Sequence, residues 1–179
     1  MLVPLGVEHA RALYDALRDP ELYRYIPTDA PATARDLEAR YRRTFAGPAA
    51  PDERWWNWAV AGRESPAVPF GTVETSLSQN GANAQIAYVF GLAAWGRGYA
   101  REACEAVLAY LGERARTTTI EAYIDTRNTR SIRLVERLGL ERVETISGAD
   151  YFKGSPSDEY HYRLSLAADE VDDAQAPSR

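Results

Sequence analysis

One stretch decides the fold of this chain: Phe90-Gly91-Leu92-Ala93-Ala94-Trp95-Gly96-Arg97-Gly98-Tyr99-Ala100-Arg101-Glu102-Ala103. An apolar strand ends in it, a glycine-bearing loop follows, and apolar residues recur at helical spacing from about Tyr99. The first turn of such a helix has unpaired N–H groups and a partial positive charge. Gly96 and Gly98 lack the Cβ atoms that would hold a ligand away from this backbone. The stretch is therefore a candidate phosphate cradle, with a plain strand-to-helix turn as the alternative.

Two well-known phosphate loops do not fit the stretch. The dinucleotide fingerprint needs a third small residue where Arg101 stands. The nucleoside-triphosphate loop needs a Gly-Lys-Ser/Thr ending, which occurs nowhere in the chain. The ligand of the loop has to be identified from the rest of the sequence.

The composition predicts one domain, residues 1–166, followed by an acidic, disordered tail, residues 167–179. The 179 residues are 45% hydrophobic, which is enough for a substantial core. The net charge is −5 with both signs mixed along the chain, so we expect neither nucleic acid nor a membrane as a direct partner. Because no secretory signal or membrane-spanning apolar run is present, we expect a cytoplasmic protein.

The few cysteines and histidines limit the chemistry further. Cys104 is the only cysteine, so the chain forms no internal disulfide, and its helical position favours a small buried side chain over a nucleophile. His9 and His161 lie far apart in the sequence, and we expect no metal site.

Helical and alternating patterns predict the order of the elements. Thr33, followed three residues later by Asp36, opens a helix with Leu37, Tyr41 and Phe45 on one face. The other predicted helices are residues 7–17, a short turn at 21–25, 99–115 and 128–138. The predicted strands are residues 2–5, 54–61, 68–77, 84–90, 118–125, 143–146 and 160–166.

Two connections set the sheet topology. Asn80-Gly81 is a strong hairpin signal, so the strands on either side of it pair antiparallel. The strand 84–90, the helix 99–115 and the strand 118–125 form a βαβ unit, which favours parallel strands. The candidate cradle then lies at the C-terminal end of a strand, where open α/β sheets bind ligands.

Three tryptophans, Trp55, Trp56 and Trp58, occur within four residues of a predicted strand. We expect them to supply core area in preference to a binding surface. The segment 23–31 and the polar loop 147–158 either line a substrate mouth or simply connect elements.

Several of these pieces in this order resemble the GNAT superfamily of acetyl-CoA-dependent N-acetyltransferases, in the RimJ/RimL-like branch related to ribosomal-protein N-terminal acetyltransferases. The resemblance covers residues 2–166 and is carried by Tyr88-Val89, the run Trp95 to Ala103, Asn128-x-x-Ser131, and Arg137-Leu138-Gly139-Leu140. It implies a single α/β (α+β) domain. Its sheet would be mixed and mostly antiparallel, with six to seven strands, a central splayed parallel pair and about four helices.

The resemblance also implies acetyl-CoA as the cofactor. The general family loop begins with Gln or Arg, and Trp95 stands at that position here, which is typical of the RimJ/RimL-like branch. Backbone amides are then the main phosphate donors, with the Arg97 and Arg101 side chains as helpers. The implied cofactor-binding residues are Val89, Phe90, Trp95, Gly96, Arg97, Gly98, Tyr99, Ala100, Arg101, Asn128 and Ser131. From the residues alone, Asn128 is equally a helix N-cap and Ser131 an ordinary first-turn residue.

The implied reaction is direct attack of an amine on the acetyl thioester, with a backbone N–H near Phe90 as the oxyanion donor. Glu74 is the candidate base because it lies mid-strand, although a solvated or salt-bridged carboxylate explains it as well. Many family members have a tyrosine acid for the leaving thiolate, but the matching stretch here is Arg133-Leu134-Val135-Glu136. Ser131 is the candidate replacement, with Tyr123 and Tyr151 as further candidates.

Three functions stay open at this point. The first is acetylation of a peptide or protein α-amine, the second is acetylation of a small amine such as an antibiotic, polyamine or amino acid, and the third is a catalytically silent acyl-CoA sensor. Acidic and aromatic residues of the segments that could line the mouth favour a cationic amine. These residues are Tyr25, Asp29, Asp150, Asp158 and Glu159. Both a monomer and a homodimer are compatible with the sequence.

Overall fold

The computed structural model of this chain describes residues 1–48 and 52–166, so the predicted acidic tail lies outside the described residues. The α-helices are α1 (His9–Leu17), α2 (Ala34–Phe45), α3 (Tyr99–Tyr110) and α4 (Thr129–Arg137). Shorter helical turns are η1 (Pro20–Tyr23), η2 (Leu92–Ala94) and the π-helical η3 (Leu111–Ala115). The strands are β1 (Leu2–Pro4), β2 (Glu53–Gly62), β3 (Ser65–Ser78), β4 (Asn83–Phe90), β5 (Thr119–Asp125), β6 (Glu141–Phe152) and β7 (Ser155–Ser165).

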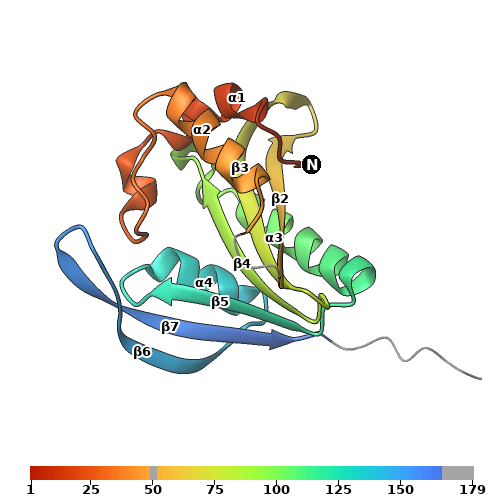
Figure 1. Cartoon of the computed structure of the whole chain (residues 1–179), viewed down its shortest axis with the longest axis vertical. Helices are drawn as coiled ribbons and strands as arrows, with labels where there is room; N and C mark the ends of the chain where they lie inside the picture. Colours follow the sequence, from red (N-terminus) through yellow and green to blue (C-terminus); the bar gives the residue numbers. More distant parts are fainter. Residues whose placement is uncertain (49–51, 167–179) are drawn as a thin grey trace, which may run out of the picture.

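The strands form one seven-stranded sheet in the order β1-β2-β3-β4-β5-β7-β6. Every neighbouring pair is antiparallel except β4 and β5, which are parallel, as the βαβ unit predicts. Their ladder joins only Asn83–Gln85 to Thr119–Glu121. Beyond these residues the two strands diverge, and Figure 1 shows β4 and β5 leaving this junction in different directions. The predicted fold, including the splayed parallel pair, is confirmed.

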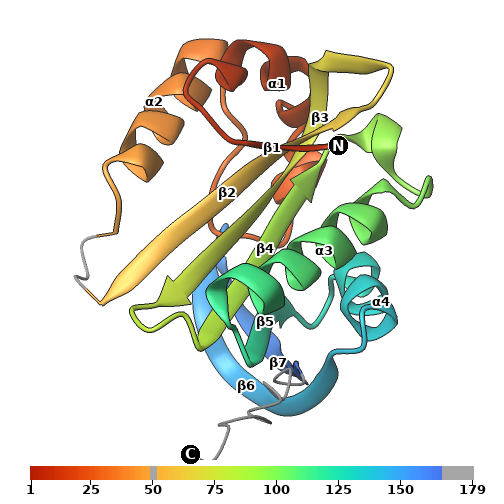
Figure 2. The same ribbon diagram turned by 90° about the vertical axis from the view of Figure 1, so that its right-hand side faces the viewer.

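Helices cover both faces of the sheet (Figure 2). α3 and α4 pack on one face, around buried residues such as Ile86, Val107 and Val135. α1 and α2 pack on the other face of β2–β4, where Leu13, Leu37 and other apolar side chains form a second cluster. The sheet thus separates two helical layers, and the gap where β4 and β5 diverge connects its two faces.

The capping box of α2 forms as predicted. The Thr33 hydroxyl accepts a hydrogen bond from the Asp36 N–H at 3.2 Å, and the Asp36 carboxylate accepts one from the Thr33 N–H at 2.8 Å. Leu37 and Tyr41 are buried, whereas Phe45, predicted on the same face of the helix, is 53% exposed. Phe45 is the last residue of the helix, whereas the buried cluster under α2 reaches only to Tyr41.

The polar segment 147–158 is not the predicted loop. β6 and β7 run through it and pair on either side of Lys153-Gly154, which have φ angles of 52° and 79°. Two successive positive φ angles fit a tight hairpin turn. Lysine is an unusual residue for such a turn. The preceding Ser147-Gly148-Ala149-Asp150 has low strand propensity, so the local sequence does not predict the hairpin.

The predicted long helix forms over residues 99–115, but its last turn is not α-helical. α3 stops at Tyr110, and the following turn, Leu111–Ala115, is π-helical and closes with Arg116 at a φ of 57°. The aromatic strand has a mixed role. Trp56 and Trp58 pack edge-on against Tyr110, as expected for core residues, whereas Trp55 is 38% exposed. None of the helices in the described part of the chain has the length and apolar character needed to cross a membrane.

Candidate functional site

The gap between β4 and β5 exposes one edge of β4. The Gly91 N–H donates to the Phe70 carbonyl on β3 at 2.9 Å, and antiparallel strands alternate between residues that face the partner and residues that face away. The backbone of Val89 therefore faces β3, whereas the backbones of Tyr88 and Phe90 face the gap. This corrects the expected edge contact at Val89 to Tyr88, because Val89 shares the parity of Gly91.

The loop after β4 is open at its two glycines, as a phosphate cradle requires. Gly96 and Gly98 have φ angles of 72° and 81°, and a Cβ atom on either would meet no atom within 4 Å. Gly98 caps α3 without any side-chain hydrogen bond, and the Glu102 N–H returns to its carbonyl at 3.0 Å. The amides of Tyr99, Ala100 and Arg101 thus lie in the unpaired first turn, behind open space. This fits the diphosphate of a nucleotide cofactor.

Trp95 anchors the loop and is itself covered by a cation. Its indole Nε1–H donates to the Phe90 carbonyl at 2.8 Å, which fixes the loop against the end of β4. The Arg130 guanidinium lies over the Trp95 ring at 3.9 Å. Sequence reasoning missed Arg130, whose only signal was its place in the first turn of the predicted helix 128–138.

The two predicted arginine helpers differ in their partners. The Arg101 Nε–H donates to the Glu105 carboxylate at 2.7 Å, one turn along α3. The Arg97 guanidinium lies 5.0 Å from the Tyr99 ring centroid and is exposed. Among the described residues Arg97 has no carboxylate partner, so it is the better placed of the two to meet an anion.

The first turn of α4 faces β4 across the gap. The Asn128 side-chain oxygen accepts the Ser131 N–H at 3.2 Å, so Asn128 is the N-cap of α4. The Tyr88 hydroxyl donates to the Ser131 carbonyl at 3.3 Å and joins the two walls of the gap. Burial raises the pKa of Tyr88, so this hydroxyl stays protonated at neutral pH. Tyr88 is a second residue that sequence reasoning did not assign to the chemistry.

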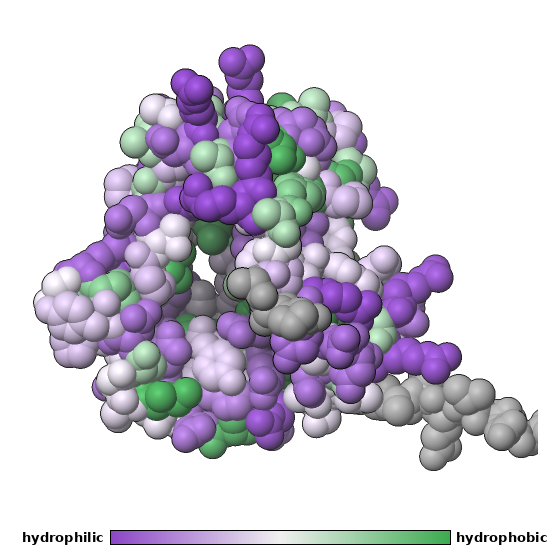
Figure 3. All heavy atoms as spheres, in the orientation of Figure 1, coloured by the Kyte–Doolittle hydropathy of each residue, from purple (hydrophilic) through white to green (hydrophobic). Residues whose placement is uncertain are grey.

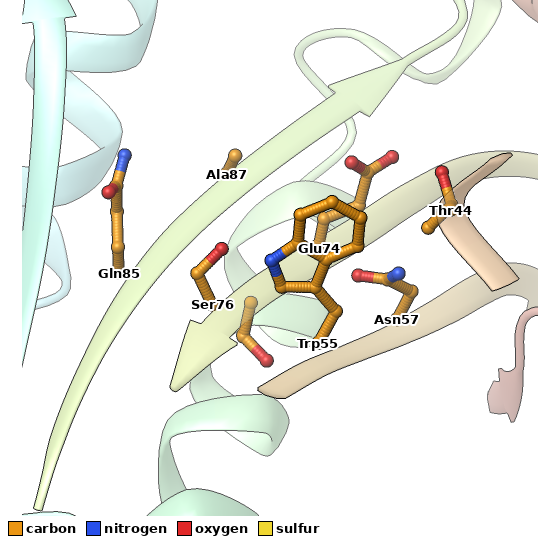
Figure 4. A pocket seen from close by; sticks show the side chains of 8 residues that line it. Thr44, Trp55, Asn57, Glu74, Ser76, Gln85 and Ala87 are labelled. Carbon is orange, nitrogen blue, oxygen red and sulfur yellow. The ribbon is translucent and has the colours of Figure 1, made fainter. Parts of the chain in front are cut away.

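Glu74 lies on the opposite face of the sheet, in a pocket of about 220 Å³. Figure 4 shows its carboxyl pointing away from β3, on the side where Thr44 of α2 lies. The Thr72 hydroxyl donates to Glu74 Oε1 at 3.3 Å. Burial raises the pKa of Glu74, and the Thr72 hydrogen bond and the Arg40 charge only partly oppose this. The residues lining the pocket are Thr44, Trp55, Asn57, Glu74, Thr75, Ser76, Gln85 and Ala87.

The two other tyrosine candidates lie on the C-terminal strands. Tyr123 stacks on His161 with ring centroids 4.5 Å apart and planes at 5°. Tyr151 is 69% exposed on β6, near the hairpin turn. Neither forms a hydrogen bond through its hydroxyl within the described part of the chain, whereas Tyr88 bridges directly to α4.

The hairpin of β6 and β7 reaches the segment that follows η1. The Lys153 ammonium donates to the carbonyls of Tyr23 and Ile26, and lies 4.0 Å from the Asp29 carboxylate. These contacts join the segments 23–31 and 147–158, each of which was expected either to line a substrate mouth or to connect elements. Figure 3 shows the surface hollowed between the N-terminal elements and the C-terminal strands.

Carboxylates gather at the end of β5 and on its neighbours. Asp125 pairs with Glu159 across the sheet, and Asp150 with Ser157. Burial and the charges of Asp150 and Asp125 raise the pKa of Glu159. Of the other predicted acidic residues, Asp158 accepts the Gly148 N–H at 2.8 Å and is thereby committed to the hairpin.

Comparison with known proteins gives the family. The model of the acetyltransferase (GNAT) domain matches residues 1–141. The uncharacterized N-acetyltransferase p20 of Bacillus licheniformis is 30% identical over 88 residues, 49% of each chain. The uncharacterized protein YkkB of Bacillus subtilis is 39% identical over 62 residues, 35% of this chain and 36% of its own. The matches thus span half or less of these curated relatives.

Solved structures share the fold over 92% of this chain. A GNAT-family acetyltransferase from Bacillus anthracis has a TM-score of 0.77 at 21% identity, over 93% of its length. A ribosomal-protein-S5-alanine acetyltransferase from Vibrio fischeri has a TM-score of 0.75 at 15% identity, over 91% of its length. A spermidine N-acetyltransferase from Vibrio cholerae, in complex with CoA and spermine, has a TM-score of 0.71 at 16% identity, over 94% of its length.

Proposed function

This chain belongs to the GNAT acetyltransferase family, and from that premise we propose that it transfers an acetyl group from acetyl-CoA to the α-amino group of a peptide or protein. GNAT acetyltransferases use acetyl-CoA, and the family match confirms the expected acyltransferase domain. The finer assignment to the RimJ/RimL-like branch is supported by the Trp-Gly-x-Gly-Tyr-Ala form of the loop at Trp95 and by the similarity to the S5-alanine acetyltransferase fold.

The observation that carries the proposal is the unpaired edge of β4 next to the N-terminus of α3, which has no side-chain cap. The amides of α3 would bind the diphosphate, with Arg97 and Arg130 supplying positive charge. The Tyr88 backbone would take an amide group of the pantetheine arm, as a neighbouring strand would, while the Phe90 carbonyl is held by Trp95 and the Phe90 N–H stays available. Acetyl-CoA supplies the activated acetyl thioester when it is bound.

The residues of this chain then divide the chemistry between the two faces of the sheet. Glu74 would accept a proton from the ammonium of the acceptor, and the free amine would form a C–N bond to the acetyl carbon before the C–S bond breaks. The Phe90 N–H would donate to the acetyl oxygen while that oxygen carries negative charge. Ser131 would hydrogen bond the departing thiolate, and Tyr88 would do so once its O–H leaves the Ser131 carbonyl. The thiolate would finally take up the proton that the attacking nitrogen loses as the amide forms.

The acceptor class follows from basicity. An α-amino group has a pKa of about 7.7 to 8.0, against about 10.4 for a lysine side chain. Near neutral pH a weak base suffices to free the α-amine, and a carboxyl with a raised pKa is such a base. This supports an N-terminal acceptor over a lysine side chain.

A second candidate is acetylation of a small polyamine. Asp150 and Glu159 bring negative charge together on β6 and β7, which would attract an acceptor that carries several cationic groups, whereas Asp125 is already paired with Arg127. The similarity to the fold of a spermidine N-acetyltransferase gives this candidate a precedent in the same architecture.

Two measurements test the proposal. Acetyl-CoA at about 100 times its dissociation constant should add about 2.7 kcal/mol to the free energy of unfolding, so the absence of a thermal shift would refute the cofactor assignment. Thiol release from acetyl-CoA, measured with a panel of peptides, spermidine and aminoglycosides, then identifies the acceptor class. Binding of acetyl-CoA without turnover on any acceptor would favour the sensor.

A further inference from the structure

Asn57 is an unusual residue for its place in the sheet. It lies in the middle of β2 between Trp56 and Trp58, although asparagine is depleted in strands. Its backbone is fixed there, since its carbonyl accepts the Leu5 N–H at 2.8 Å. Its side chain is half-buried, and the side-chain amide forms no hydrogen bond within residues 1–48 and 52–166. This amide is therefore free to bind a molecule from outside the chain.

Asn57 shares a pocket with Glu74. The two residues are Cα partners across β2 and β3, and Glu74 is in turn the partner of Ala87 on β4. Side chains that are opposite each other on one face have Cβ atoms about 4.5–5.5 Å apart. All three residues line the pocket of about 220 Å³ (Figure 4). Because a single water needs only about 10–15 Å³, this pocket has room for an organic group.

The two polar groups of this row have complementary chemistry. The Glu74 carboxyl accepts a hydrogen bond from the Thr72 hydroxyl at 3.3 Å, and no bond joins it to Asn57 in the described part of the chain. An ionised carboxyl accepts hydrogen bonds, whereas an asparagine amide also donates two. The first residue of a peptide carries the matching groups on a single Cα atom, because its α-ammonium donates and its carbonyl oxygen accepts.

The rest of the pocket is polar but uncharged. Two residues further along the strands, about 6.8 Å away, a second row is formed by Trp55, Ser76 and Gln85. Among the described residues, Glu74 is thus the one charged residue that lines the pocket. A polyamine would bring a second ammonium into this row without a counter-charge, which is costly when that ammonium is desolvated. The amide groups of a peptide would meet neutral hydrogen-bonding partners instead.

We propose that Asn57 is a specificity-determining residue, which donates to the carbonyl of the acceptor's first residue while Glu74 holds the α-ammonium. This subsite rests on the proposed function, because it gives the acceptor of that reaction its place. Glu74 lies one strand, about 4.8 Å, from Ala87 on β4. Ala87 is followed by Tyr88, whose backbone faces the gap proposed for the thioester. The bound amine is therefore close to the acetyl group that it attacks.

The first test is the Asn57→Leu variant, which removes the amide at similar size. With an alanine-initiated peptide as the acceptor, KM should rise about tenfold, because one hydrogen bond is lost. Isopropylamine, which resembles alanine but has a methyl group in place of the carbonyl, should inhibit peptide acetylation by the variant and by the wild type equally. The thermal shift given by CoA should hold. Asn83→Leu is the matched control, since Asn83 is an exposed asparagine of β4 that does not line the pocket, and its peptide KM should stay unchanged.

A second variant, Asn57→Asp, tests whether Asn57 lies beside the base. A like charge next to Glu74 disfavours ionisation of that carboxyl, so the acid limb of the pH profile of kcat/KM should move to higher pH. A purely structural role of Asn57 would not move this limb.

Four results would overturn the subsite. They are an unchanged peptide KM in a folded Asn57→Leu protein, an equal rise in the Asn83→Leu control, an equal weakening of peptide and isopropylamine, and an unshifted pH profile in Asn57→Asp. Each of them leaves peptide acetylation by the wild type intact. A wild-type protein that binds CoA but acetylates no peptide would instead refute the proposed function, and the subsite with it.

Discussion

The proposed role of Glu74 as a base would link the activity of this protein to its stability. Burial raises the pKa of the Glu74 carboxyl because the protonated form is the more stable one in the folded protein. Its contribution to the free energy of unfolding is therefore largest at pH values below the ordinary pKa of a glutamate. As the pH rises through the folded-state pKa, the ionised form develops in a partly buried place and that contribution is lost. The same ionisation prepares the base that the proposed reaction requires.

Glu74→Gln should separate these two effects. We expect kcat to fall about 100-fold, the usual contribution of a general base, while the thermal shift from CoA is preserved. The variant lacks the ionisation, so its stability relative to the wild type should grow between pH 4 and pH 8. Turnover and chemical denaturation across this pH range measure both. Normal turnover at every pH would remove Glu74 from the mechanism.

The pKa of Asp125 is shifted in the opposite direction to that of Glu74. Burial alone would raise its pKa, but hydrogen bonds from Arg127 and Ser157 bring it below its usual range. The Ser157 hydroxyl, 1% exposed, donates to Asp125 Oδ2 at 2.7 Å. A depressed carboxyl pKa stabilises the fold above the unfolded value of about 3.9, and the effect disappears as the pH falls.

Ser157→Ala should therefore lower the free energy of unfolding at pH 7 by about 1–3 kcal/mol, because a buried carboxylate loses a hydrogen bond. Urea denaturation measures the loss, and the difference from the wild type should narrow toward pH 3. Ser165→Ala, an exposed position on the same strand, is the control. Equal effects of the two substitutions at pH 7 would show that the Asp125 contact contributes nothing.

At the scale of elements, the start of α3 is the site that we propose for the acetyl donor. Gly98→Asp places a negative charge in the open space before the helix, against the proposed diphosphate. We expect CoA affinity to fall about 100-fold or more, since like charges a few ångströms apart cost several kcal/mol near a protein surface.

Calorimetric titration with CoA measures this loss. Gly47→Asp is a close match as a control, because Gly47 also has a positive φ, 83°, with nothing within 4 Å of an added Cβ. Strain and charge are then similar in the two variants, and only the location differs. Undiminished CoA binding by the Gly98 variant would refute the cradle.

The β6–β7 hairpin is held to the N-terminal half by the chain's only lysine. Lys153→Ala removes two hydrogen bonds to backbone carbonyls, so amide exchange in residues 150–156 and 23–29 should accelerate about tenfold. The β3–β4 hairpin serves as the internal reference, and Lys153→Arg, which keeps the charge, should exchange more like the wild type. Identical exchange in all three proteins would show that the contact does not hold the hairpin.

Over the whole molecule, the predictable features were those written locally. The Thr33 capping box, the Asn80-Gly81 turn and the βαβ order fix the helices and the sheet through neighbours in sequence. The approach of Arg130 to Trp95 depends on how distant elements pack, and no local pattern encodes it. The expected edge contact at Val89 was wrong for a related reason. The register between β4 and β3 decides which backbone groups of β4 face the gap, and the sequence of β4 alone does not show this register.

The splay of β4 and β5 also affects the tendency of this protein to aggregate. Bare strand edges invite pairing with other chains. The outermost strands here are poor templates, since β1 has three residues ending in Pro4 and β6 begins with exposed charges such as Glu141 and Arg142. The free stretch of β4 instead lies inside a wedge that β5 closes at Gln85. A slender molecule can slide into that wedge, whereas the sheet of another protein cannot. The fold thus leaves an unpaired strand edge available to a ligand, but not to a strand of another protein molecule.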